Sequence, residues 1–237
     1  MGSATPAEDR PAIRFDGVSF SYGRLPALDN VSLCLSRGDL AYVAGPSAAG
    51  KTTLLKLAHG ELKPQRGGLL VDGEDMTRAS RRARRRLRRR VAVVYQDYRL
   101  LRRLTALENV AYALRVADLW LPRREALARA AAALEAVGLS ARAAAFPDQL
   151  SGGQQQRLAI ARALAARPTI LLADEPTASL ERAQANRVLA LFERAAQEGA
   201  TVLVATHEVE LVSGTGRPVI LLNEGRVASD APLPRSA

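Results

Sequence analysis

Cysteine, histidine and aromatic residues are scarce in this sequence: its 237 residues include one Cys, two His and 4% aromatics. Because Cys34 is alone, an intrachain disulfide cannot form and a structural zinc site is not expected. Apolar runs of about 18 residues, the length that crosses a bilayer, are also absent, since charged residues such as Arg115 and Asp118 interrupt them. Residues 1–11 are polar and lack the apolar core of a signal peptide. We therefore expect a cytoplasmic location, with residues 1–11 as a flexible leader and residues 231–237 as a tail.

Acidic residues are missing from one strongly basic segment. Nine arginines fall between Arg78 and Arg90 with no carboxylate among them, and without these nine the net charge of +10 drops to +1. A protein that tracks nucleic acid usually spreads its basic residues over a face, so this local run argues against nucleic acid as a partner. Three interpretations stay open: a solvated helix, docking to an acidic partner segment, and attraction to the anionic inner leaflet, worth about 1 kcal/mol per Arg.

Apolar patterning indicates an α/β domain, and the apolar content of 48% is enough for a packed interior. Alternation over residues 13–20 and 27–35 predicts an antiparallel pair of strands, and residues 67–73 are typical of a strand between glycine turns. An apolar run predicts a fully buried strand at residues 91–95, and further strands are predicted at residues 40–44, 170–173, 201–205 and 219–222. Strands that alternate with helices predict a parallel sheet covered on both faces.

Between Thr105 and about Val137 the sequence becomes rich in Ala, Leu and Arg, with helical periodicity that is broken only near Pro122. Gly138 is placed to end the second helix. The stretch predicts a helical insertion in the α/β domain.

Residues 45–52 carry the phosphate-loop pattern G-x-x-x-x-G-K-T between a strand-like run and a helical one. Glycines let backbone N–H groups approach a triphosphate without a Cβ clash, and the helix points the positive end of its dipole at the nucleotide. Lys51 would place a cation between the β- and γ-phosphates, and the Thr52 hydroxyl would bind Mg²⁺. The residues expected to contact ATP here are Gly45, Pro46, Ser47, Ala48, Ala49, Gly50, Lys51, Thr52 and Thr53.

Two carboxylates, Asp174 and Glu175, follow an apolar strand, which is typical of the Walker B pattern. Ligands of α/β sheets bind at the carboxyl ends of the strands. Asp174 would hold Mg²⁺ through its water shell, and Glu175 would polarise the attacking water. Together with the phosphate loop, the pair predicts hydrolysis of ATP.

Residues 150–154, Leu-Ser-Gly-Gly-Gln, indicate a second anion-binding helix start, with Ser151 at the N-cap and a helix over residues 154–166. These motifs together resemble the nucleotide-binding subunit of ABC transporters over residues 13–227. The resemblance implies a P-loop NTPase (RecA-like) core with an antiparallel β subdomain and an inserted α-helical subdomain at about residues 97–155, all in one domain of residues 12–230. It also implies a head-to-tail homodimer in which each subunit contacts, in trans, the ATP of the other through Ser151, Gly152, Gly153 and Gln154.

Further roles follow from the same resemblance. Tyr22 resembles the aromatic residue that stacks on adenine, and Gln96 resembles the glutamine that senses Mg²⁺ and the γ-phosphate. His207 matches the histidine that contacts the γ-phosphate, so the implied catalytic set is Lys51, Glu175 and His207. We take the other histidine, His59, as structural.

Two positions depart from the family pattern. Ala48 stands where a glycine is often found, and it requires an ordinary φ because its Cβ limits the backbone. Glu181 replaces the usual aspartate of the loop that contacts the opposite subunit, which puts the coupling between the two sites in doubt but not ATP binding.

Residues 96–101, Gln-Asp-Tyr-Arg-Leu-Leu, resemble the FtsE family of cell-division ATPases, whose membrane partner is FtsX. This likeness implies a peripheral ATPase at the cytoplasmic face of the inner membrane. ATP-driven dimer closure would there regulate septal peptidoglycan hydrolysis through the partner, with Tyr98, Leu100 and Leu101 lining the groove that receives it. Lipoprotein-release and macrolide-export ATPases are alternatives, and a soluble ABC ATPase acting on nucleic acid is a further one. A scaffold that binds nucleotide without hydrolysis is disfavoured by the intact catalytic residues.

Overall fold

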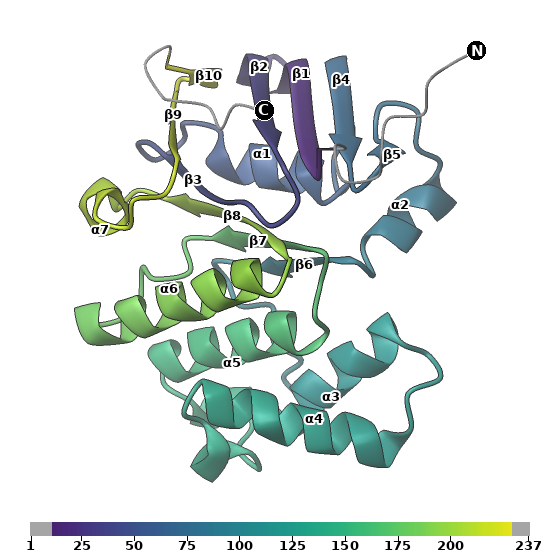
Figure 1. Cartoon of the computed structure of the whole chain (residues 1–237), viewed down its shortest axis with the longest axis vertical. Coiled ribbons are helices and arrows are strands. Elements are labelled where there is room, and N and C mark those ends of the chain that lie inside the picture. Colours follow the sequence, from purple (N-terminus) through teal and green to yellow (C-terminus); the bar gives the residue numbers. More distant parts are fainter. Residues whose placement is uncertain (1–10, 229–237) are drawn as a thin grey trace.

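Two β-sheets of different kinds organise the computed structural model, which describes residues 11–228 (Figure 1). The expected leader, apart from Pro11, and the expected tail lie outside the described residues. The larger sheet has six strands in the order β10-β9-β3-β8-β7-β6, parallel except for β10. Its strands are β3 (Leu40–Ala44), β6 (Val91–Val94), β7 (Ile170–Asp174), β8 (Thr201–Thr206), β9 (Val219–Asn223) and β10 (Arg226–Val227).

The smaller sheet is antiparallel, in the order β2-β1-β4-β5, and it contains the strand pair expected near the start of the chain. Its strands are β1 (Ile13–Tyr22), β2 (Leu25–Leu35), β4 (Arg66–Val71) and β5 (Glu74–Asp75). The expectation that Gly67 and Gly68 form a turn is wrong, because both lie inside β4. A Cβ at Gly67 would lie 2.3 Å from the Gly17 carbonyl oxygen, so the glycine permits close approach of β4 to β1.

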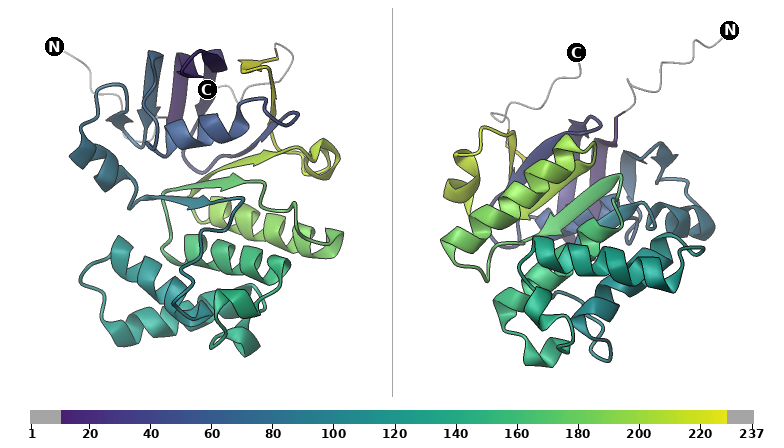
Figure 2. Two further views of the ribbon diagram at one scale, coloured as in Figure 1. Left: turned by 180° about the vertical axis from the view of Figure 1, so that it is seen from behind. Right: turned by 60° about the horizontal axis from the view of Figure 1, so that its bottom comes forward.

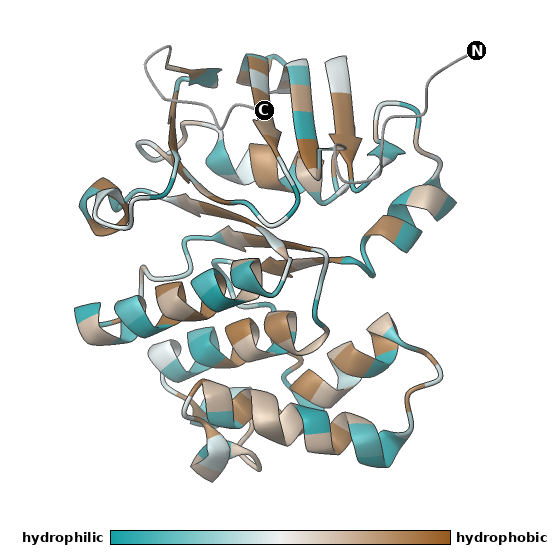
Figure 3. Cartoon of the chain, viewed as in Figure 1, coloured by the Kyte–Doolittle hydropathy of each residue, from teal (hydrophilic) through white to brown (hydrophobic). Residues whose placement is uncertain are grey.

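Both faces of the six-stranded sheet are covered, as the alternation of strands and helices predicts. Helix α1 (Lys51–Ala58) and the antiparallel sheet cover one face, while α5 (Gly152–Ala165), α6 (Arg182–Gln197) and the short α7 (Val209–Ser213) cover the other. The central strands β3, β7 and β8 are buried along their whole length, and most of their length is coloured hydrophobic in Figure 3. The predicted parallel sheet, covered on both faces, is confirmed.

The strand over residues 91–95 was expected to be fully buried, and this is wrong in two respects. β6 stops at Val94, and Ala92 and Val93 are only half-buried. Their partial exposure follows from the position of β6 at the edge of the sheet, where it has a neighbour only on the β7 side.

The helical insertion contains α3 (Ala106–Ala117) and α4 (Arg123–Ala136), followed by 3₁₀ turns at Ser140–Arg142 and Pro147–Gln149. Thr105 caps α3 in a capping box with Glu108. Pro122 immediately precedes α4, in agreement with the break that the sequence predicts there. Leu158 and Ala161 of α5 pack against these helices, whereas Ile160 and Ala163 of the same helix pack against the sheet. Helix α5 therefore joins the helical part to the sheet (Figure 2).

The arginine run forms α2 (Arg81–Leu87), a short helix capped by the Ser80 side chain. Leu87 is fully buried, which contributes about 2 kcal/mol to holding the helix on the domain. The arginines around it stay at the surface or half-buried, so a helical form of the run is confirmed.

Gly45 provides a test of whether the phosphate loop needs a glycine for close packing against β9. A Cβ at Gly45 would lie 2.0 Å from the Leu222 carbonyl oxygen of β9, so the clash is with a neighbouring strand and not with a nucleotide. We expect Gly45→Ala to lower the free energy of unfolding by about 3 kcal/mol in urea denaturation without nucleotide. Gly23→Ala is the control: it has open space around its Cβ and should lose only about 1 kcal/mol, from its positive φ. Equal losses would contradict the clash.

Candidate functional site

The phosphate loop, residues 45–50, connects β3 to α1 at the carboxyl edge of the parallel sheet. Lys51 opens α1, and its side chain bends back so that Nζ donates to the carbonyl oxygens of Gly45 (2.8 Å) and Pro46 (3.0 Å). Only 7% of Lys51 is exposed. The loop thus encloses a buried ammonium group at the start of a helix, an arrangement that attracts anions.

Ala48 does not have the ordinary φ expected from its sequence; its φ is +64°. The Ala49 N–H donates to the Pro46 carbonyl oxygen at 3.2 Å, so residues 46–49 form a closed turn with Ala48 in its third position. A turn of this kind with a positive φ at the third position normally takes glycine. Ala48 therefore adopts a conformation that costs an L-residue about 1 kcal/mol.

A line of three charged or titratable groups crosses the carboxyl edge of the sheet. Glu175 directly follows β7, and its Oε1 lies 3.6 Å from Lys51 Nζ. Its Oε2 lies 2.9 Å from His207 Nδ1 and also accepts the His207 backbone N–H at 3.2 Å. Glu175 is 9% exposed and has a φ of +49°. The structure thus brings together the three residues named as catalytic from the sequence, from α1, β7 and β8.

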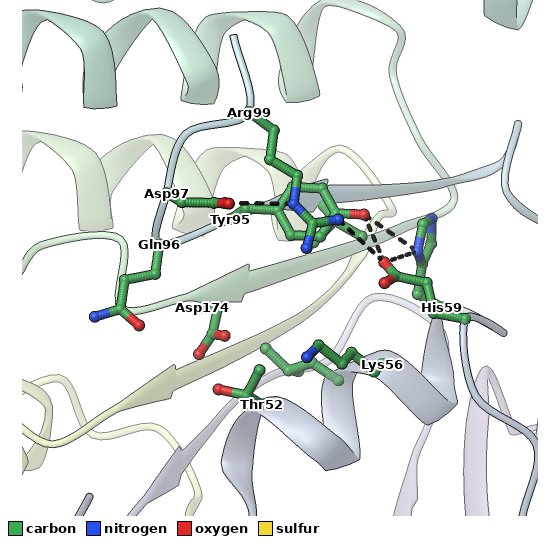
Figure 4. A pocket seen from close by; sticks show the side chains of 11 residues that line it. Thr52, Lys56, His59, Tyr95, Gln96, Asp97, Arg99 and Asp174 are labelled. Carbon is green, nitrogen blue, oxygen red and sulfur yellow. Dashed lines mark hydrogen bonds and ion pairs between the residues drawn. The ribbon is translucent and has the colours of Figure 1, made fainter.

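Asp174, the last residue of β7, is buried beside Thr52 (Figure 4). Burial raises the pKa of the Asp174 carboxyl, an effect that the nearby Thr52 hydroxyl opposes. Asp174 Oδ1 has no hydrogen-bond partner. A buried carboxylate oxygen without a donor beside a threonine hydroxyl fits Mg²⁺, which is commonly held by one or two protein oxygens together with substrate phosphates.

Gln96 lines a pocket of about 380 Å³ that also includes Thr52 and Asp174 (Figure 4). It follows β6 after one residue and is exposed, which leaves its amide free to turn toward a ligand. From the sequence, Gln96 could be grouped with Thr52 and Asp174 only through the family resemblance. The structure places all three around one cavity.

The same pocket contains a network that sequence reasoning missed. Glu61 Oε1 accepts a hydrogen bond from the Tyr95 hydroxyl at 2.7 Å and lies 2.9 Å from His59 Nδ1. The Arg99 guanidinium lies 3.7 Å from the Tyr95 ring centroid and 3.8 Å from Glu61 Oε1. Hydrogen bonding to His59 is the main cause that lowers the pKa of Glu61 to about 2. No local motif signals this network, because its members come from two segments more than 30 residues apart.

The three residues expected to line a partner groove are arranged differently. The Tyr98 hydroxyl donates to Ser179 Oγ at 3.1 Å, and the Tyr98 carbonyl oxygen accepts from Arg162 at 2.7 Å. Leu100 packs against the helical core, and only Leu101 is exposed. Tyr98 and Leu100 are half-buried by these contacts, and the role of the three residues in lining a partner groove stays a prediction.

Tyr22 ends β1 and is 46% exposed, with its ring packed edge-on against Phe20 at 5.0 Å. The Thr53 hydroxyl donates to the Tyr22 hydroxyl at 3.5 Å, which places the ring near the start of α1. This position is compatible with stacking on a base. The stacking role stays a prediction.

The second helix start has the cap geometry that the sequence predicts. Ser151 is the N-cap of α5, and its hydroxyl accepts from the Gln154 N–H at 3.3 Å while Gln154 Oε1 accepts from the Ser151 N–H at 2.9 Å. Ser151 and Gly152 are exposed. Residues 151–154 are absent from the lining of the pocket that contains Thr52 and Gln96. Their contact with a nucleotide in trans stays a prediction.

The loop after Glu175 packs against α5 through a residue the sequence analysis did not name. The buried side chain of Gln156 donates to the Pro176 carbonyl oxygen at 2.8 Å. Glu181 is the exposed N-cap of α6 but makes no side-chain cap hydrogen bond. Its longer side chain is therefore not used within the subunit.

This fold and site define a P-loop ATP-binding cassette. Residues 28–178, more than half of the chain, match the ABC transporter family. The chain therefore belongs to that family. It is an ATPase of the ABC type, and its cofactors are ATP and Mg²⁺.

Relatives of two kinds are similar to this chain. The methionine import ATP-binding protein MetN of Brucella abortus is 39% identical over 96% of this chain and 62% of its own length. MetN 2 of Rhodococcus jostii is 44% identical over 92% and 65% respectively, so the chain spans less than two thirds of these proteins. The cell division ATP-binding protein FtsE of Streptococcus pneumoniae is 41% identical over 86% of this chain and 88% of its own length.

Solved structures agree with the fold. The dimeric post-hydrolysis structure of the ATP-binding cassette MJ0796 with ADP and Pi has a TM-score of 0.87 at 33% identity, over 94% of this chain and 99% of that one. CbiO1 from Clostridium perfringens, part of the transporter complex cbiONQ, has a TM-score of 0.81 at 28% identity, over 92% and 87%. None of the helices formed by residues 11–228 has the length and apolar character that crossing a bilayer requires.

Asp174 provides a test of the metal site. Because one oxygen of its buried carboxylate lacks a donor, Asp174→Asn should raise the stability of the nucleotide-free protein by about 1 kcal/mol at neutral pH while abolishing Mg²⁺-dependent hydrolysis. The pKa of Asp174 is raised by folding, so the wild type is penalised only where the carboxyl is ionised. The gain should therefore disappear as the pH falls below the ordinary Asp pKa, about 3.9. Thermal denaturation across pH measures this, and a variant that is less stable at every pH would contradict it.

Proposed function

We propose that this chain is the ATP-hydrolysing subunit of an FtsEX-like ABC complex, in which closure of a homodimer on ATP drives a membrane partner. The observation that carries the enzymatic part is the position of Glu175 between Lys51 and His207. A carboxylate held at both oxygens, at the edge of a phosphate loop, is suited to orient and deprotonate a water molecule.

ATP binding would use the phosphate loop and its flanking residues. The N–H groups of residues 45–53 and the Lys51 ammonium would surround the phosphates, with Lys51 exchanging its two carbonyl partners for phosphate oxygens. Tyr22, exposed beside Thr53, would stack on adenine. The order β3, loop, α1 supports this proposal, since the helix start then faces the anion.

Mg²⁺ would be held by Thr52 and Asp174, with Gln96 lining the same pocket. When bound, the ion supplies positive charge that neutralises the phosphates and stabilises the leaving group. Asp174 Oδ1, which accepts no hydrogen bond, supports this assignment. Gln96 would contact Mg²⁺ and the γ-phosphate, so that residues 97–101, which follow it in the chain, would respond to their binding.

Hydrolysis would proceed by attack of water on the γ-phosphate, with Glu175 accepting the proton. His207 would contact the γ-phosphate through its exposed ring while its backbone N–H keeps Glu175 in place. The His207 side chain is 53% exposed, so it can reach a ligand that a buried ring could not.

Completion of the site would require a second copy. Ser151, Gly152, Gly153 and Gln154 form an exposed capped helix start outside the pocket of their own subunit, which supports their action on the neighbour's ATP. The MJ0796 cassette, a similar fold, is dimeric. The homodimer would sit at the cytoplasmic face of the inner membrane as a peripheral unit on an integral membrane partner resembling FtsX.

The cell-division assignment rests on two supports. Residues 96–101 match the FtsE pattern, and the Streptococcus pneumoniae FtsE relative aligns over 88% of its own length. A second candidate is the ATPase of a methionine importer. It is favoured by the MetN relatives, which align over up to 97% of this chain.

Co-purification from detergent-solubilised membranes separates these two functions. The intact chain, tagged and recovered from its own cells, should bring down a membrane protein with a large extracytoplasmic loop if the FtsEX-like function is right. Recovery of a permease with its methionine-binding protein would instead establish the second candidate. Recovery of DNA-repair subunits would contradict both.

The catalytic assignment has its own test. Glu175→Gln keeps the size of the side chain but removes the base, so we expect hydrolysis to fall by at least about 100-fold while Mg-ATP binding is kept. Size-exclusion chromatography should then show a dimer that persists in Mg-ATP. Lys51→Ala is the control, because it should weaken ATP binding and leave a monomer. A Glu175→Gln variant that binds ATP and still elutes only as a monomer would contradict the dimer mechanism.

A further inference from the structure

The arginine helix α2 has two different sides. Arg81, Arg84, Arg85 and Arg88 are spaced as i, i+3, i+4 and i+7, which places them along one side of the helix. Together with Glu61 they line a hollow of about 340 Å³. We call this set of four the arginine face. In Figure 1, α2 lies beside β5, away from α5 and α6.

Two arginines outside the arginine face are paired with acidic residues of the antiparallel sheet region. Arg86 pairs with Glu74 at 2.7 Å, and Arg90 pairs with Asp72 at 2.8 Å. Within residues 11–228, Arg81, Arg84 and Arg85 form no ion pair. These two ion pairs therefore involve no member of the arginine face.

Glu61 offsets only part of the positive charge of the arginine face. Its Oε1 is already engaged by the Tyr95 hydroxyl at 2.7 Å and by His59 at 2.9 Å. The Arg88 guanidinium reaches the Gly60 carbonyl oxygen at 2.6 Å instead of this carboxylate. Four guanidinium groups thus face one carboxylate that is directed toward α1 and Tyr95, and the hollow has an excess of positive charge.

We propose that the arginine face is a binding site for a phosphate-bearing anion, either a phospholipid headgroup or a free phosphate ester. Guanidinium groups match the geometry of phosphate with paired N–H donors and stay charged at all physiological pH values. The concave shape favours a discrete headgroup-sized ligand over a flat surface. The site stands independently of the cell-division assignment, since it needs neither ATP nor the membrane partner.

The test compares two double variants that lose the same charge. Arg81→Ala with Arg85→Ala removes two members of the arginine face. Arg82→Ala with Arg89→Ala removes two exposed arginines of the same run that do not line the hollow. Melting temperatures of both proteins verify that the fold is intact.

Binding is measured by co-sedimentation with vesicles of phosphatidylcholine alone or mixed with an equal part of phosphatidylglycerol. It is also measured by calorimetry with sn-glycerol 3-phosphate and with pyrophosphate. All measurements contain saturating Mg-ADP, so that the phosphate loop is occupied. We expect the first variant to bind at least about tenfold more weakly than the wild type, and the second to stay within about threefold.

The pattern of binding distinguishes the two ligand sources. If the Arg81→Ala, Arg85→Ala variant loses binding only to the phosphatidylglycerol vesicles, the ligand is a lipid headgroup. If it also loses binding to the soluble phosphates, the ligand is a free phosphate ester. Equal weakening of both variants would mean a diffuse charge effect, and it would overturn the proposal. Absence of wild-type binding to all of these anions would overturn it as well.

Discussion

The parallel register of β3, β8 and β7 is the constraint on which the site depends. Ala44 pairs with Thr206, and Asp174 pairs with Ala205, so the three strands end within one residue of each other. The segments that follow them are the phosphate loop, Glu175 and His207. Because parallel strands end together at one edge, Lys51 and Glu175, which are more than 120 positions apart along the chain, meet within ion-pair distance. A slip of one residue would turn each of these side chains to the wrong face.

Unfavourable local features gather at this edge. Ala48 and Glu175 have positive φ values, and Asp174 keeps a buried oxygen without a donor. Each costs on the order of 1 to 3 kcal/mol, and the apolar layers on both faces of the sheet offset them. A bound triphosphate with its metal would relieve part of this cost, because it supplies the charge that the undonated oxygen lacks. The free energy of triphosphate binding would thus include relief of the unfavourable features at this edge of the sheet.

Glu61 lies between the pocket at the sheet edge and the hollow beside α2. It lines the pocket that contains Gln96 and also the hollow of the arginine face. Its hydrogen bond to Tyr95 fixes the residue directly before Gln96. An anion on α2 would therefore lie next to the network that positions the segment leading into the helical part, which joins the proposed anion site to the ATP site by contiguous contacts.

The amino-acid sequence by itself determined the phosphate loop, the Walker B carboxylates and the helix caps at Thr105 and Ser151, since each depends on residues within a few positions of one another. It also determined the class of fold through its strand and helix periodicity. Tertiary structure alone decided that β6 is an edge strand, that Tyr98 contacts Ser179 and Arg162, and that the arginine face has more guanidinium groups than carboxylates around it. These features depend on neighbours from distant segments, and a local pattern of polarity does not specify which distant segments come into contact.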